Sequence, residues 1–143
     1  MNLASALATG TPDDVLRATL AHFQCAAGTV HLLKDGALAL AAHVNIPPPV
    51  VEIVRTVPIG KGIAGLAAER REPVSLCNLQ TDTSGQARPA AKTTGMEGSV
   101  AVPMLDGENL RGVLGIAKAQ AHDWSDAEKA ELLAIAARLA TRV

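Results

Sequence analysis

The sequence predicts an α+β fold built on an antiparallel β-sheet. Two Asp-Gly pairs, beginning at Asp35 and Asp106, each lie between two runs of strand-forming residues, which is the pattern of a β-hairpin. Both faces of the first hairpin carry apolar side chains, so we expect the sheet to be covered on both sides. Apolar residues at helical spacing near both ends of the chain indicate the helices that would cover it.

Capping signals predict where the two terminal helices begin. Thr11 is followed by a proline and two acidic residues, and apolar residues then recur at helical spacing. Ser125 and Glu128 have the spacing of a capping box and precede a broad apolar stripe. We therefore expect helices over about 12–24 and 125–142.

Proline, glycine and polar stretches divide the rest of the chain. Three consecutive prolines follow the first hairpin and can open a short helix, and a glycine-rich stretch leads into another. A long polar segment has the length of a binding loop or lid. Pro103 predicts a bulge or an unpaired edge within the second hairpin. The expected elements are hairpins at about 28–44 and 98–118, short helices at 48–57 and 62–71, a strand at 73–77 and a lid loop at 78–97.

Composition narrows the classes of function. The chain has 143 residues and a formal net charge of -1, so we expect neither nucleic acid nor a membrane surface as a partner. No apolar run is long enough to span a membrane and no signal peptide is recognisable, so a cytoplasmic location is expected. Cys25 and Cys77 lack the spacing of a metal site or disulfide framework. Phe23 and Trp124 are accompanied by no tyrosine, which disfavours large planar cofactors, and we predict no cofactor.

Gly60, Gly62 and Gly65 have the G-x-G-x-x-G spacing of a dinucleotide-binding loop. Such a loop needs a buried strand before it and a parallel βαβ arrangement around it. Here the preceding residues follow three prolines and are typical of a helix, and the strands come in antiparallel hairpins. We therefore interpret the glycines as a turn with positive φ and a close helix contact. A weaker hypothesis is that Lys61 and the helix start attract an anion.

Two blocks of sequence resemble the GAF domain, a small-molecule sensing module. They are "VPIGKGIAGLAAERREPVSL" and "GSVAVPMLDGENLRGVLGIAK", in this order and at this separation. The resemblance implies a single domain over 1–143 with three layers, α/β/α. Its central antiparallel sheet would have five to six strands, with the terminal helices on one face. Short helices and the long loop would cover a ligand pocket on the other face.

The resemblance also implies which residues border the pocket. The candidate ligand-binding residues are Lys61, Gly62, Ile63, Cys77, Asn78, Asp82, Met96, Ser99, Val100, Val102 and His43. Cys77 either borders the pocket or is a small buried hydrophobe. Arg88 and Lys92 on the loop either close over an anion or belong to a solvated lid. His31 and His43 lack a third metal ligand, so no metal site is predicted.

We therefore predict a non-catalytic sensor or regulatory domain for a small polar or anionic molecule, whose identity the residues do not reveal. The resemblance further implies a homodimer through the terminal helices and a signalling partner protein. One alternative is a redox enzyme of the free-methionine-sulfoxide-reductase type, which lacks its second cysteine here. Another is a pure dimerisation module. Cyclic nucleotides are disfavoured, because Ala117-Lys118 stands where relatives that bind them carry Asn-Lys.

Overall fold

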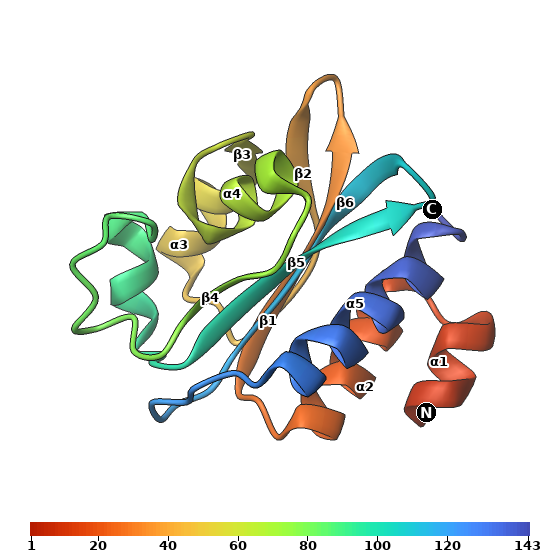
Figure 1. The fold of residues 1–143 in the computed structure, drawn as a ribbon, viewed down its shortest axis with the longest axis horizontal. Coiled ribbons are helices and arrows are strands. Elements are labelled where there is room, and N and C mark those ends of the chain that lie inside the picture. The colour runs from red at the N-terminus through yellow and green to blue at the C-terminus, as the bar shows by residue number, and fades with distance from the viewer.

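A six-stranded antiparallel sheet forms the middle layer of the computed structural model, which describes residues 1–143 (Figure 1). The strands lie in the order β3-β2-β1-β6-β5-β4. Their bounds are β1 Ala27–Lys34, β2 Ala37–Val44, β3 Thr56–Pro58, β4 Val74–Leu76, β5 Ser99–Asp106 and β6 Asn109–Ala117. The two predicted hairpins are confirmed as β1–β2 and β5–β6, and they meet through the pairing of β1 with β6 in the middle of the sheet.

Helices cover both faces of this sheet. Figure 1 shows α1, α2 and α5 packed together on one face, while α3, α4 and a 3₁₀ helix lie on the other. The bounds are α1 Leu3–Thr9, α2 Pro12–Phe23, α3 Pro48–Val54, α4 Gly62–Arg70, the 3₁₀ helix Pro89–Thr94 and α5 Asp126–Ala140. We call the two faces the helix face and the lid face. The predicted α+β class is confirmed. None of the helices is long and apolar enough to cross a membrane.

Reciprocal capping boxes begin both long helices, at Ser125 as predicted and also at Thr11, where only a capping threonine was predicted. The Thr11 hydroxyl accepts from Asp14 N at 3.2 Å, and the Asp14 carboxylate accepts from Thr11 N at 3.0 Å. Ser125 and Glu128 do the same at the start of α5. Each box satisfies two amides that a helix start leaves without a partner, so it fixes the first turn.

Two elements differ from the sequence prediction. The segment before Thr11 forms the short helix α1, which Asn2 caps by accepting from Ser5 N. The helix predicted over 48–57 ends at Val54, and the next residues form the edge strand β3 against β2. An extended conformation there gives the free edge of β2 a hydrogen-bonded neighbour, which a continued helix would not.

Large aliphatic side chains fill the helix face. Twenty buried residues from α1, α2, α5 and the sheet form one continuous cluster. Its fully buried members include Leu16, Met104, Leu114, Leu132 and Leu139. Because each such side chain contributes about 1.5–3 kcal/mol on burial, this layer supplies most of the hydrophobic stabilisation.

The lid face is packed more sparsely. Its cluster has seven buried residues, including Leu38, Val57 and Val113, and lies under α4. Pro103 sits on β5 beyond the end of the β4 pairing, which stops at Ala101, so β5 has no neighbour on that side there. This is the unpaired edge that the proline predicted.

Candidate functional site

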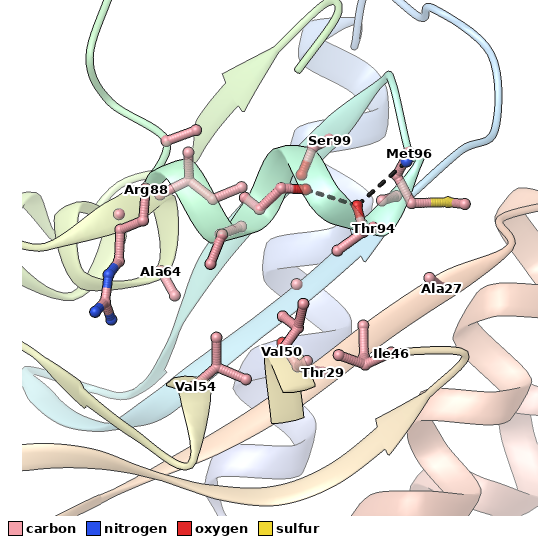
Figure 2. Close-up of a pocket in the computed structure, with 18 of the residues that line it drawn as sticks. Ala27, Thr29, Ile46, Val50, Val54, Ala64, Arg88, Thr94, Met96 and Ser99 are labelled. Carbon is pink, nitrogen blue, oxygen red and sulfur yellow. Dashed lines mark hydrogen bonds between the residues drawn. The ribbon is translucent and has the colours of Figure 1, made fainter. Parts of the chain in front are cut away.

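A cavity of about 150 Å³ lies on the lid face, between the sheet, α3, the start of α4 and the loop that carries the 3₁₀ helix. Figure 2 shows Val50 and Val54 on one side of it and the lid residues Arg88, Thr94 and Met96 on another. The surfaces that enclose it are mainly apolar. The position agrees with the pocket that the resemblance implied.

Small side chains on three neighbouring strands create this space. The register sets β1, β6 and β5 side by side, so each position on β6 has one partner on either strand. Two such rows form the floor: Ala27, Ala117 and Ser99, then Thr29, Gly115 and Ala101. Larger residues at these six positions would fill the space against α3 and the lid.

His31 lies one row further along the floor and is 2% exposed. Its Nε2 is 2.9 Å from the Val54 carbonyl oxygen at the end of α3. A carbonyl only accepts, so Nε2 carries the proton and donates. Nδ1 is buried with no hydrogen-bond partner. Burial lowers the pKa of His31, which favours the neutral ring and leaves Nδ1 as an acceptor without a partner in the chain.

The charged residues that line the cavity are all cationic. Lys61 and Arg88 both line it, and no aspartate or glutamate does. The Arg88 Nη1 is buried without a hydrogen-bond partner. Neither cation takes part in an ion pair of the chain. The charged residues of the lining are therefore both positive, and such a site favours an anion.

The start of α4 adds backbone donors to the same end of the cavity. The first helical hydrogen bond runs from Gly65 N to Lys61 O at 3.1 Å, so the amides of Gly62, Ile63 and Ala64 precede it. No side chain caps them. A Cβ on Gly62 would lie 3.1 Å from Arg88 Cγ, which places the arginine stem directly against this turn. The field of a helix start contributes about 0.3–1 kcal/mol, so it assists the two cations rather than replacing them.

The three glycines have the backbone roles that the sequence predicted. Gly60 and Gly62 have φ of 89° and 69°. Gly60 N donates to Gly65 O at 2.8 Å, which closes the turn. A Cβ on Gly65 would lie 2.5 Å from Pro58 O, so α4 can approach the turn this closely only with glycine there.

The structure brings five of the predicted pocket residues to the cavity: Lys61, Gly62, Ile63, Met96 and Ser99. Val100 and Val102 are placed elsewhere. Both are fully buried in the cluster on the helix face. Residues alternate between the two faces along β5, and Ser99 and Ala101 are the residues that face the cavity.

The other predicted residues also lie outside the cavity lining. His43 is exposed on β2, and Cys77 is exposed at the end of β4. Asn78 joins the two ends of the lid, because its side chain donates to Glu97 Oε1 and accepts from Gln80 N. Asp82 accepts from the Ser84 hydroxyl in the lid and lines a separate shallow hollow with Lys92.

His31, Thr29 and Gly115 were not among the predicted site residues, although all three line the cavity. Their signal is positional: each becomes visible only when the register of β1 and β6 is known. Arg88 was weighed as a lid residue, and its buried nitrogen is the observation that the sequence lacks.

Neither thiol lines the cavity. Cys25 is partly buried beside the cluster on the helix face, where burial raises the pKa of its thiol to about 11. Cys77 is exposed on the outside of the lid face. The structure contains no group of three or more histidine, cysteine, aspartate or glutamate side chains placed to hold a metal ion.

The family model for the GAF domain matches residues 9–143. The chain belongs to the GAF domain family. This GAF domain is similar to that of a phosphoenolpyruvate-protein phosphotransferase from Acinetobacter, with a TM-score of 0.79 and 19% identity, covering 97% of this chain and 86% of that one. The corresponding domain from Coxiella burnetii has a TM-score of 0.75 and 24% identity, with 98% and 81% covered.

An enzyme shares the fold as well. The free methionine-R-sulfoxide reductase of Neisseria meningitidis, solved with its substrate, has a TM-score of 0.80 and 16% identity, covering 98% of this chain and 83% of that one. At these identities the likeness concerns the fold alone. No curated protein matches the chain significantly.

Proposed function

We propose that this GAF domain is a non-catalytic sensor that binds a small organic anion in the cavity beneath the lid. The observation that carries the proposal is the buried, unpartnered Arg88 Nη1 in an apolar cavity whose only charged lining residues are cations. Part of a guanidinium buried without a partner is costly, so a bound anion would relieve that cost. A domain that served only to dimerise would gain nothing from this arrangement.

Thiol-based reduction of methionine sulfoxide is the competing function, because reductases of that kind share the fold. It needs a reactive thiol at the bound substrate. Here Cys77 and Cys25 lie outside the cavity lining, and burial holds the Cys25 thiol protonated. A thiol-dependent reductase activity that disappears in Cys77→Ser would contradict the non-catalytic assignment.

A thermal-shift screen of organic acids tests the sensor proposal. A true ligand at a hundredfold excess over its Kd should stabilise the domain by about 2.7 kcal/mol, which corresponds to a rise in Tm of about 8 °C. Amino acids, nucleotides and inorganic oxyanions belong in the same screen, because the proposal predicts that organic anions dominate the hits.

Gly115→Val is the matched control for any hit. A Cβ at this position would be 3.4 Å from the Thr29 hydroxyl and 3.9 Å from Val100 O, both ordinary contacts, so we expect the valine to be accommodated in the cavity. It should abolish the ligand-induced shift while leaving the unliganded Tm unchanged or slightly raised, since valine suits a central strand better than glycine. A shift of full size in Gly115→Val would place the ligand elsewhere.

We also propose that two copies associate through the terminal helices. On α5 the outward residues include exposed Ala130 and Ala134, whose small side chains allow another helix to approach closely. Light scattering at tens of micromolar should then give twice the chain mass of 14.7 kDa. A monomer at that concentration would contradict the dimer and leave the ligand proposal intact.

A further inference from the structure

The cavity is polar at one end and apolar at the other. In Figure 2, Arg88 lies at one end, beside Ala64, whereas Met96 and Ala27 lie at the opposite end. His31 belongs to the Arg88 end, because its ring is hydrogen-bonded to the carbonyl oxygen of Val54, and Figure 2 shows Val54 at that end. Residues on one face of a strand repeat every ~6.6 Å, so Ala27 and His31 are about 13 Å apart along β1.

Two lining residues at the polar end carry hydrogen-bonding atoms that have no partner in the chain. Arg88 is a donor that matches a carboxylate, and Lys61 and the free amides at the start of α4 add to it. His31 is an acceptor through Nδ1, since its other nitrogen donates to the Val54 carbonyl. An occupant that satisfies both has a carboxylate and, close to it, a group that donates a hydrogen bond.

The charge of the cavity lining favours a hydroxyl group over an ammonium group as the donor to His31 Nδ1. An ammonium group would enter a space lined by two cations and no carboxylate, where only neutral acceptors such as His31 Nδ1 and the Thr29 hydroxyl could receive it. The loss of hydration would then go uncompensated and the repulsion from Arg88 and Lys61 would add to it. A hydroxyl donates equally well to Nδ1 and carries no charge.

The size and lining of the cavity define the remainder of the molecule. A cavity of about 150 Å³ accommodates a molecule only somewhat larger than benzene. The end formed by Met96, Ala27 and Ile46 is mainly aliphatic, with the hydroxyl groups of Thr94 and Ser99 nearby, and offers no ring for stacking. A branched or straight chain of a few carbons fits, whereas a sugar phosphate or a nucleotide is too large and too polar.

We propose, on the basis of the sensor function above, that the occupant is a short aliphatic hydroxycarboxylate and not the corresponding amino acid. The carboxylate lies against Arg88 and Lys61 at the start of α4, the hydroxyl donates to His31 Nδ1, and the alkyl chain extends over Thr29 in the direction of Ala27.

Isothermal titration calorimetry with four isosteric probes tests this assignment at neutral pH. The probes are 2-hydroxy-4-methylpentanoate, 4-methylpentanoate, leucine and 4-methylpentane-1,2-diol, with 3-hydroxy-4-methylpentanoate as a second hydroxyl position. A hydroxy acid should bind tightest. Loss of the hydroxyl, its replacement by ammonium and loss of the carboxylate should each weaken binding about tenfold or more. Leucine binding as tightly as both hydroxy acids, or 4-methylpentanoate binding as tightly, would overturn the proposal.

Substitutions of Arg88 and of His31 then test the carboxylate contact and the hydroxyl contact separately. Arg88→Met keeps the apolar stem and should weaken every carboxylate probe about tenfold or more. Lys92→Met is its control on the same lid, because the Lys92 ammonium binds the Asp82 carbonyl oxygen outside the cavity, and it should leave affinity unchanged. Equal losses in the two variants would refute the role of Arg88.

His31→Leu should abolish the preference for the hydroxy acid over 4-methylpentanoate, while the affinity for 4-methylpentanoate itself persists. His31→Gln, which keeps a donor and an acceptor, should retain part of that preference. A preference that is unchanged in His31→Leu would overturn the hydroxyl contact. If all five probes fail but another molecule from the broader screen binds and is lost in Gly115→Val, the ligand class is wrong and the sensor function stands.

Discussion

The helix face and the lid face share the same strands but are filled in opposite ways. On β5, Val100, Val102 and Met104 point to the helix face and are completely buried there. The residues that alternate with them include Ser99 and Ala101, which leave room for a cavity on the lid face. Large side chains therefore fill the helix face, whereas small side chains on the lid face leave a cavity. The comparison teaches that the larger core cluster and the candidate cavity lie on opposite sides of a single sheet.

The largest effect should come from removing volume on the helix face. Leu114 is 0% exposed on β6, so Leu114→Ala should lower the free energy of unfolding by about 2–5 kcal/mol. Ile53→Ala is the comparison on the lid side, because Ile53 lines the cavity and is 45% exposed. It should cost far less stability. Urea unfolding of both variants measures the difference, and similar losses would mean that the two faces contribute alike.

Val102 tests the alternation along β5 directly. Val102→Ala should destabilise the domain by about 2 kcal/mol, because two buried methyl groups are lost, and should leave ligand affinity unchanged. Ala101, its neighbour, faces the cavity, so Ala101→Val should weaken binding with a smaller effect on stability. Calorimetry for affinity and urea unfolding for stability separate the two outcomes. A loss of ligand affinity in Val102→Ala would indicate that Val102 does contribute to the binding site.

The start of α2 offers a smaller perturbation of the helix face that removes no core volume. Thr11→Ala deletes the hydroxyl that accepts from Asp14 N, and the loss of such a cap costs about 1 kcal/mol. Ser125→Ala should cost a similar amount at the start of α5. Thermal unfolding measures both, and neither change should alter ligand affinity if the faces act separately.

The smallest effect is a pH dependence that originates on the lid face. Burial lowers the pKa of His31, so the unfolded chain binds more protons than the folded one at mildly acidic pH. The contribution to stability is complete above about pH 6.5, the usual pKa of histidine, and is lost as the pH falls towards the folded value. Unfolding titrations between pH 7.5 and 5.5 should show a shallower slope for His31→Gln than for the wild type. Equal slopes of the free energy of unfolding against pH in the two proteins would show that His31 is not the source of the pH dependence.

Local signals in the sequence were sufficient for much of the fold. The Asp-Gly turns, the two capping boxes and the Gly60–Gly65 turn depend on residues close together in the chain, and the structure has all of them. Edge strand β3 was missed because its pairing with β2 depends on a neighbour that only the tertiary fold supplies.

The candidate site was less accessible for the same physical reason. Ser99 to Met104 are six consecutive buried residues, so hydrophobicity does not reveal which of them face the lid. Val100 and Val102 were assigned to the pocket for this reason. The floor formed by Thr29, Gly115 and their neighbours exists only across three strands in register, and no linear pattern records it.

The absence of a side chain at Gly115 has a consequence for how such domains diverge. A glycine codon becomes a valine codon by one base change, and a Cβ at this position makes only ordinary contacts. A single substitution, Gly115→Val, can therefore fill the cavity while the fold is retained, and the reverse substitution can restore the cavity. Proteins that share this fold therefore need not bind the same ligand. A descendant with a filled cavity would still fold, and selection could reuse it for assembly alone.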